Sequence, residues 1–324
     1  MHNLDTINGL LRAPQALETR RDKLKEAIDN FLMANLDPSN SPNLLHEAPD
    51  DIMPLFEVFG AEVFRRSDLL VPMLKVAKVL MRKQANRALI QDAHVLSLIP
   101  VLSSPKNVMA AREAANVVLN MCYDSQNVST FVQNGGARAL LPLTQSADIH
   151  LQGSALGALQ SVSYQKEGRS ALRDIGAVAA VCSLLASEHH KVVARAVGAV
   201  HNLSADAQSL RLIREAGGLG GLVPLLRSHE AEVCALAAGA LQNLSREQAS
   251  RAALAAAAGG SGGGAVGPLA DLLVGGDVQA QASAAGALWN IVGPDLDEMK
   301  REAFRVFLTD SIVMGMIGSC FQSR

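Results

Sequence analysis

Aromatic residues are scarce in this sequence. Only 3% of the 324 residues are Phe, Trp or Tyr, although 49% are hydrophobic. So high an apolar fraction excludes general disorder, because burial of this much apolar surface can offset the entropy lost on ordering. A core with few rings must instead pack small side chains closely and regularly.

Other features are also missing, and each absence excludes a class of protein. Four cysteines are too few for a disulfide framework, so a reducing, cytoplasmic location is expected. No run approaches the ~18 apolar residues of a membrane span, and neither a signal peptide nor a lipidation motif is recognised. No direct membrane anchor is therefore expected. A net charge of −2 argues against nucleic-acid binding.

An internal repeat is present instead. Its clearest copies are SALGALQSVS (154–163), RAVGAVHNLS (195–204), LAAGALQNLS (236–245) and SAAGALWNIV (283–292). Their glycines are spaced by 41, 41 and 47 residues, and a second series has the same spacing, at Gly135, Gly176, Gly217 and Gly264. The six extra residues therefore belong to a Gly-rich insertion at 256–264. The segment 114–122 extends the register backward by one copy.

Each copy has helical periodicity. Residues 206–246 predict a short helix that ends at glycine, a second short helix, and a longer third helix with one apolar stripe. No segment alternates like a strand. Three helices in ~41 residues form a unit that can bury its apolar face only against its neighbours.

These copies resemble the armadillo repeat found in β-catenin, importin-α and vacuole-type armadillo proteins. The resemblance implies an all-α fold, a right-handed α-solenoid superhelix with three helices per unit. The predicted organisation is an N-terminal helical cap with a degenerate repeat (1–82), five repeats (83–123, 124–164, 165–205, 206–246 and 247–293) and a C-terminal two-helix cap (294–324). Seven of the eight Phe residues lie outside 83–293, so large rings are expected at the two ends.

The resemblance also implies a binding groove lined by the third helices. In the family, an Asn near the end of each third helix hydrogen-bonds the backbone of an extended peptide. The matching positions here are Asn120, Ser161, Asn202, Asn243 and Asn290, of which Ser161 departs from the pattern. Their neighbours His201, Gln242 and Trp289 are further candidates for groove contacts. The alternative is that these Asn side chains only serve the helix end and the turn that follows.

A tryptophan ladder is absent. Importin-type receptors place Trp four residues before that Asn, whereas this chain has Asn116, Gly157, Gly198, Gly239 and Gly286 there. A receptor for basic nuclear-localisation signals is therefore not expected. The one tryptophan, Trp289, directly precedes Asn290, and packing at a repeat interface is favoured for it over ligand recognition.

Basic residues gather near the start of the repeats. Lys75, Lys78 and Arg82 are predicted to share one helical face, which Arg112 would extend. An acidic partner segment could dock there, guided by this charge. The alternatives are a solvated face without a ligand, and neutralisation within the chain by the acidic segment 46–51.

No catalytic site is predicted. GGSGG (259–263) and GGGAVG (262–267) match hydrolase and dinucleotide motifs by letters only, because both motifs need a preceding strand and RAALAAAA predicts a helix. Neither a metal nor a cofactor is expected, since no Cys and His have zinc-ligand spacing.

The sequence therefore favours a non-enzymatic adaptor or scaffold that binds a protein partner, as an extended peptide or a helix. The first alternative is a structural component of a cytoskeletal assembly such as a flagellar axoneme, and a regulator of a small GTPase or of nuclear transport is a further one. The nearly uncharged segment 311–321 either caps the end of the repeats or supports self-association.

Overall fold

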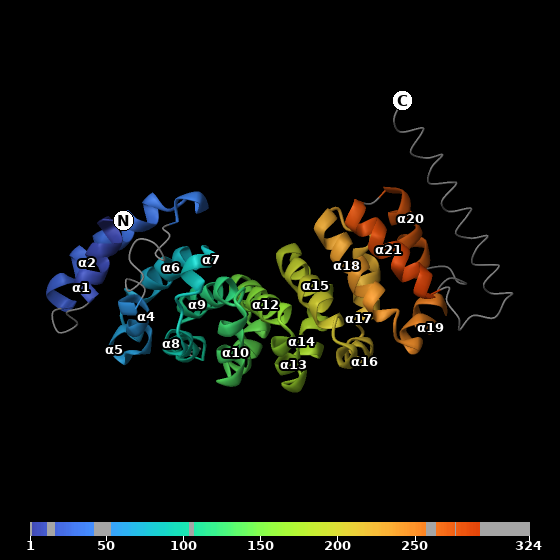
Figure 1. The fold of residues 1–324 in the computed structure, drawn as a ribbon, viewed down its shortest axis with the longest axis horizontal. Coiled ribbons are helices and arrows are strands. Elements are labelled where there is room, and N and C mark those ends of the chain that lie inside the picture. The colour runs from blue at the N-terminus through green and yellow to red at the C-terminus, as the bar shows by residue number, and fades with distance from the viewer. Residues whose placement is uncertain are drawn as a thin grey trace, which may run out of the picture. The chain divides into compact units, whose positions relative to one another are not determined.

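The computed structural model describes residues 2–11, 17–41, 53–103, 107–256, 264–275 and 277–291. Throughout these ranges the chain forms helices and no strand, which confirms the predicted all-α class. None of the described helices is both long and apolar enough to cross a membrane. Three sequence predictions lie outside these ranges: the acidic segment 46–51, the core of the insertion at 257–263 and the cap at 294–324. The chain divides into two compact units, 1–175 and 176–324. Figure 1 labels the helices along the chain.

The first unit begins with the predicted cap. Its helices are α1 (His2–Leu11), α2 (Leu17–Ala34), the 3₁₀ turn η2 (Pro38–Asn40), α4 (Met53–Gly60), α5 (Glu62–Arg65) and α6 (Leu70–Leu80). The predicted repeat 83–123 then holds α7 (Gln84–Arg87), α8 (Asp92–Leu102) and α9 (Val108–Met121). The next holds α10 (Ser125–Gln133), α11 (Gly136–Leu140) with η4 (Leu141–Gln145), and α12 (Ile149–Tyr164), and α13 (Lys166–Asp174) follows.

The second unit continues the same order of helices. It starts with α14 (Ala177–Ser183), η5 (Leu184–Ala186) and α15 (His190–Ser204). The segment 206–246 holds α16 (Ala207–Glu215), α17 (Gly218–Leu225) and α18 (Ala231–Leu244). The last described segment holds α19 (Gln248–Ala256), α20 (Val266–Gly275) and α21 (Val278–Ile291).

Local sequence signals set many of the helix boundaries. The Asp124 carboxylate accepts the backbone N–H of Gln126 at 2.9 Å, and the Asp148 carboxylate accepts that of Leu151 at 2.7 Å. Both are N-cap bonds that satisfy donors left open at a helix start. Between the first and second helices, glycine adopts left-handed backbone at Gly135, Gly176 and Gly217, with φ of 79°, 75° and 77°. These glycines therefore end one helix and redirect the chain into the next.

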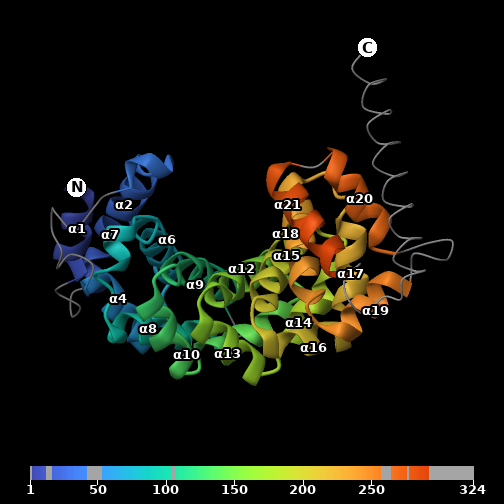
Figure 2. The same cartoon turned by 45° about the vertical axis from the view of Figure 1, so that its right-hand side comes forward.

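The third helices pack side by side within each unit. In the first unit α6 contacts α9, and α9 contacts α12; in the second unit α15 contacts α18, and α18 contacts α21 (Figure 2). These helices are rich in small buried residues, such as Ala114 and Ala115 of α9 and Gly157 and Ala158 of α12. Close approach of helix backbones is thus the physical reason that the repeats need few rings.

Large rings are buried among the helices of the predicted N-terminal cap. Phe56 and Phe59 of α4 are fully buried and meet edge to face with ring centroids 5.5 Å apart. Phe31 of α2 and Phe64 of α5 are also buried. The predicted gathering of rings is therefore present at this end, while Phe304, Phe307 and Phe321 lie outside the described residues.

Candidate functional site

A hydrogen-bonded relay joins the third helices α15 and α18 of the second unit. The Asn243 side chain donates from Nδ2 to Ser204 Oγ at 3.0 Å. The Ser204 hydroxyl in turn donates to the His201 carbonyl at 2.7 Å. Ser204 is only 1% exposed, so this bond between repeats is shielded from water.

The same relay recurs between α18 and α21. Asn290 Nδ2 lies 3.0 Å from Ser245 Oγ and 3.3 Å from the Gln242 carbonyl. Ser245 donates to that carbonyl at 2.7 Å. In the first unit, Asn120 Nδ2 reaches back from α9 to the Lys78 carbonyl of α6 at 3.2 Å. The Asn side chains of α9, α18 and α21 therefore hold each of these helices to the third helix before it, a role that neither interpretation of the sequence included.

The side-chain oxygens (Oδ1) of the same three asparagines are available as hydrogen-bond acceptors. Asn120, Asn243 and Asn290 are half-buried, and within the described residues no hydrogen bond to their Oδ1 atoms is found. Each Oδ1 is an acceptor that suits a peptide N–H.

Two of the predicted groove positions differ from these three. Ser161 is 5% exposed, so it is not presented to a ligand as the sequence suggested. Asn202 is half-buried and hydrogen-bonds with the neighbouring His201 ring. Burial lowers the pKa of His201, and the bond with Asn202 only partly opposes this. His201 is therefore neutral at physiological pH.

His201 and Gln242 face the next repeat rather than the groove. A Cβ built on Gly239 of α18 would lie 2.9 Å from Cδ2 and Nε2 of the His201 ring. Gln242 covers Gly286 of α21 in the same way. At two positions of the missing tryptophan ladder, Gly239 and Gly286, glycine thus makes room for a side chain of the preceding third helix, and a larger residue there would separate the repeats.

Trp289 occupies the position of His201 and Gln242 in the last described third helix. Its side chain is 81% exposed. The segment that follows α21 lies outside the described residues, so packing of Trp289 at a repeat interface stays a prediction.

A buried carboxylate organises the predicted basic residues. Lys78 Nζ lies 2.7 Å from Oε2 of Glu113, whose side chain is 4% exposed, and Arg112 lies 3.4 Å from Oε1 of the same group. Burial raises the pKa of Glu113, but the hydrogen bond and charge of Lys78, the charge of Arg112 and a hydrogen bond with Asn116 outweigh it, so the pKa lies below its ordinary value. Lys78 is thus engaged in an ion pair with Glu113 within the chain.

Arg82 does not share the helical face predicted for it. Helix α6 ends at Leu80, because the chain turns at Met81 toward α7, and Arg82 lies in that turn. Its guanidinium donates to the Asn35 carbonyl at 3.1 Å. Lys75 has no carboxylate within 4.0 Å among the described residues. Lys75, Lys78 and Arg112 remain together as three cations against one carboxylate, and we call them with Glu113 the basic cluster.

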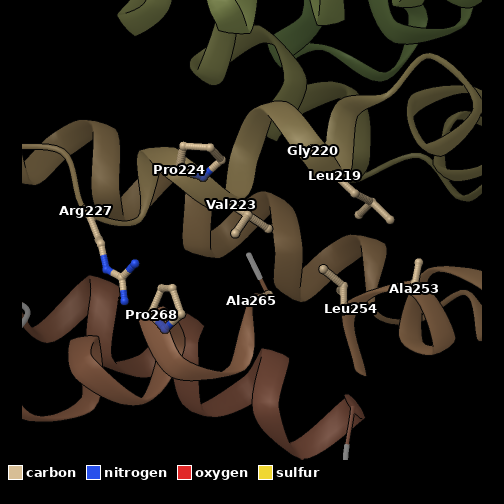
Figure 3. A pocket seen from close by; sticks show the side chains of 10 residues that line it. Leu219, Gly220, Val223, Pro224, Arg227, Ala253, Leu254, Ala265 and Pro268 are labelled. Atoms are coloured by element: carbon tan, nitrogen blue, oxygen red, sulfur yellow. The ribbon is translucent and has the colours of Figure 1, made fainter. Parts of the chain in front are cut away.

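A hollow of about 640 Å³ in the second unit was not foreseen from the sequence (Figure 3). It is lined mainly by apolar residues of α17, α19 and α20, including Leu219, Val223, Pro224, Leu254, Ala265 and Pro268. Its charged residue, Arg227, pairs with Asp271 at 3.4 Å. The hollow thus lies on first and second helices, not among the third helices that hold the relay.

The cysteines of the described residues are free thiols. Burial raises the pKa of Cys122, and raises that of Cys182 to about 12. Both are therefore protonated at neutral pH and are poor nucleophiles. Among the described residues, no group of three His, Cys, Asp or Glu side chains is placed to bind a metal ion.

Comparisons with known proteins agree with this architecture. A family model described as the Armadillo/beta-catenin-like repeat matches residues 206–246. A designed armadillo repeat protein has the same fold with a TM-score of 0.65 and 19% identity, over 76% of this chain and 100% of its own. A computationally designed set for modular peptide recognition gives a TM-score of 0.61 and 19% identity, over 75% of this chain and 99% of that one.

A third designed armadillo repeat protein, in complex with the peptide (KR)4, has a TM-score of 0.56 and 17% identity over 89% of this chain and 99% of its own. A search of curated protein sequences found no match. Residues 206–246 are thus recognised by sequence as an armadillo repeat, and most of the chain shares the armadillo-repeat fold of these designed proteins.

Proposed function

We propose that this protein is a non-enzymatic adaptor that binds an extended segment of a partner protein along its third helices. The observation that carries the proposal is the fixed amide of Asn243 and of Asn290. Each Nδ2 is held by the preceding repeat, so the amide has a set orientation, and its Oδ1 is left as an acceptor. Repetition of this acceptor from helix to helix suits the repeating N–H groups of a peptide backbone.

The family and the relatives support a binding role. Armadillo repeats typically mediate protein or peptide binding, and two of the similar designed proteins were made for peptide recognition or carry a peptide. The proposal includes no catalytic step and no cofactor. It places the protein in the cytoplasm, which is supported by the free, buried thiols of Cys122, Cys182 and Cys234.

The charge of the basic cluster favours an acidic partner. Glu113 can offset only one of the three cations Lys75, Lys78 and Arg112. The cations of Lys75 and Arg112 lie on α6 and α9, the third helices of the first unit, so their field acts on a segment approaching those helices. We therefore propose that the partner segment carries acidic residues, unlike the basic (KR)4 peptide of the designed relative.

The first test uses peptides selected from a random displayed library by the full chain. The double variant Asn243→Ala with Asn290→Ala should bind these peptides about tenfold more weakly, since each lost hydrogen bond costs about 0.5–1.5 kcal/mol and 1.4 kcal/mol is tenfold. Gln208→Ala, on the exposed side of α16, is the control and should bind like the wild type. Affinity is measured by fluorescence anisotropy.

Ser204→Ala separates recognition from structure. It removes the acceptor that holds Asn243 but leaves the Asn243 carbonyl in place. If Asn243 contacts the peptide, Ser204→Ala should retain more affinity than Asn243→Ala, although both lower the thermal unfolding temperature. Equal affinity of the wild type and the double Asn variant for the selected peptides would contradict peptide binding along the third helices. Co-sedimentation of both with microtubules would then favour the cytoskeletal alternative.

The second test concerns the acidic partner. Lys75→Glu should slow association with acidic peptides from the same library several-fold at low salt, with a smaller effect at high salt, because a charge outside the contact acts mainly on the on-rate. Lys75 is the suitable position because its reversal breaks no ion pair of the described residues, whereas reversal of Lys78 would disrupt Glu113. Lys166→Glu, an exposed change on α13, is the matched control, and equal slowing by both variants would contradict a local site.

A further inference from the structure

The hollow of the second unit lies between two successive repeats. In the preceding pair of repeats, Val178 and Cys182 of α14 are 2% and 5% exposed, and α14 contacts α17. Leu219 and Val223 of α17 stand in the same repeat positions, 41 residues later, but both are only half-buried and line the hollow. An apolar surface that is covered in one repeat is therefore open in the next.

A change of residue at one repeat position explains this opening. Small residues occupy the position in three repeats, at Ala139, Ala180 and Gly221. Gly221 lets α17 approach the preceding repeat closely, because a Cβ built on it would lie 2.8 Å from Cβ of Leu185. In α20 the position holds Pro268, whose ring needs more room and which lines the hollow. Helix α20 therefore cannot approach α17 as closely as α17 approaches the repeat before it.

A smaller hollow of about 260 Å³ shares Arg227 with the larger one. The Arg227 guanidinium pairs with Asp271 on the surface, and Figure 3 shows it beside Pro268 at the edge of the larger hollow. The smaller hollow is lined in part by Asp277, whose carboxylate accepts the backbone N–H of Ala280 at 2.8 Å. Asp277 has no cation within 4.0 Å among the described residues. Apolar walls and an unpaired carboxylate thus lie on either side of Arg227.

We propose that these two hollows bind a basic, apolar segment of a partner protein. Large apolar side chains of the segment fill the larger hollow, whose volume of about 640 Å³ lies in the range of about 300–1,000 Å³ that is usual for ligand sites. A Lys or Arg of the same segment pairs with Asp277. From 206 to 293 the chain has seven Asp or Glu against five Lys or Arg, so the charge of these two repeats also favours a cation.

The segment that joins α19 to α20 is poor in large side chains. Its sequence from 257 to 263 is AAGGSGG, with no side chain larger than that of serine. Since burial of large apolar groups supplies most of the affinity in such a site, a partner suits the hollow better than this segment does. The site is built from first and second helices and the starts of α18 and α21, so it does not depend on the Asn side chains of the proposed groove.

Gly220 provides a direct way to fill the larger hollow. It is an exposed residue of α17 that lines the hollow, and no atom of the described residues lies within 4 Å of a Cβ built on it. Gly220→Trp therefore adds a ring to the hollow without a collision. Peptides are selected from a random displayed library with the wild-type full chain, and those that also bind Gly220→Trp are removed. The remaining peptides should carry large apolar residues and a Lys or Arg, and should bind Gly220→Trp at least about tenfold more weakly in fluorescence anisotropy.

Two further variants bear on the larger hollow. Gly9→Trp is the matched control, because Gly9 is an exposed helical glycine of α1 with no atom of the described residues within 4 Å of its Cβ. It should bind the remaining peptides like the wild type. Pro224→Lys adds a charge at an exposed position of the hollow and should weaken the same peptides several-fold, which keeps the test valid if Gly220→Trp folds poorly.

Asp277→Asn tests the smaller hollow. Asparagine serves as an N-cap as well as aspartate does but carries no charge, so the start of α21 is retained. The variant should bind the remaining peptides several-fold more weakly at low salt, with a smaller difference at high salt. Asp148→Asn, the same exchange at the N-cap of α12, is the control and should change nothing.

Three results would overturn the proposal: loss of every peptide in the counter-selection, remaining peptides that are rich in Asp and Glu, or equal affinities of the wild type and Asp277→Asn. The double variant Asn243→Ala with Asn290→Ala should bind the remaining peptides like the wild type. A failure of this site is therefore distinguishable from a failure of the groove.

Discussion

Replacing Gly168 with alanine should destabilise the protein by about 3 kcal/mol, the upper part of the range for overpacking a buried site. Gly168 is buried in α13, against the end of α12. A Cβ there would collide with the Val162 carbonyl oxygen and would lie 2.8 Å from its carbonyl carbon and 2.9 Å from its Cγ1. Backbone atoms cannot swing aside, so α13 would have to move away from α12.

Gly153→Ala is the matched control, because it adds the same methyl group to a helical glycine of the same unit. No atom of the described residues lies within 4 Å of a Cβ at Gly153. There alanine should be neutral or stabilise α12 by up to about 1 kcal/mol through helix propensity. Urea unfolding followed by circular dichroism measures both variants. Equal midpoints for the two alanine variants would show that the contact with Val162 relaxes without cost.

The repeat register explains why glycine is tolerated at 168. One and two repeats earlier, Asn127 and Asn86 stand in this position, and their side chains donate to the carbonyls of Met121 and Leu80 at 3.3 and 2.8 Å. In the repeat of Gly168 the equivalent carbonyl is that of Val162, which accepts the backbone N–H of Gln165 at 3.3 Å. Arg169, like Arg87 two repeats earlier, donates to the two carbonyls that follow, those of Ser163 and Tyr164, at 3.1 and 2.7 Å. The Val162 carbonyl therefore needs no side-chain donor at position 168, and α13 can approach closely.

The helices and their turns could be predicted because their signals are local. A glycine after each first helix predicts left-handed backbone, and Gly135, Gly176 and Gly217 all adopt it. The 41-residue spacing then extends one correct unit to its neighbours. Recognition of the family depended on this repetition, since the family model matches one unit only.

The hydrogen-bond and ion-pair partners of individual side chains could not be predicted in the same way. The sequence placed Asn243 and Asn290 at the end of a third helix, but an amide can serve a ligand, its own helix or a neighbour, and these donate to a neighbour. Glu113 was missed because its partner Lys78 is 35 residues away, a separation that is not the repeat period. The predicted helical face of Arg82 was wrong because the prediction extended the helix beyond Leu80, where α6 ends.

Lys78→Met should destabilise the protein by about 2 kcal/mol at neutral pH, and by much less near pH 4. The side chain of Glu113 is 4% exposed, and removal of its nearest cation leaves a buried carboxylate with only Arg112, 3.4 Å away. Loss of one partner of a fully buried pair costs about 3–5 kcal/mol, and the 28% exposure of the Lys78 side chain lowers that figure through solvent screening.

The pH dependence follows from the direction of the Glu113 pKa in each protein. In the wild type the pKa lies below its ordinary value of 4.5. The ionised group therefore contributes stability that is present above pH 4.5 and is lost as the pH falls through the folded-state pKa. Without Lys78, we expect burial, the largest single contribution, to outweigh Arg112 and Asn116 and to raise the pKa of Glu113 above its ordinary value. The charged form of Glu113 then destabilises the folded variant at neutral pH. This destabilisation disappears when Glu113 takes up a proton at lower pH.

Lys75→Met, one turn earlier on α6, is the matched control. It removes the same charge from the same helix but breaks no ion pair of the described residues, so its effect should stay within about 0.5 kcal/mol at both pH values. Urea unfolding of both variants at the two pH values completes the test. A Lys78→Met effect independent of pH would mean that the lysine stem, not its charge, stabilises α9. A pH-dependent effect confined to Lys78 would assign that cation to Glu113 and leave Lys75 as the cation of the basic cluster that is open to a partner.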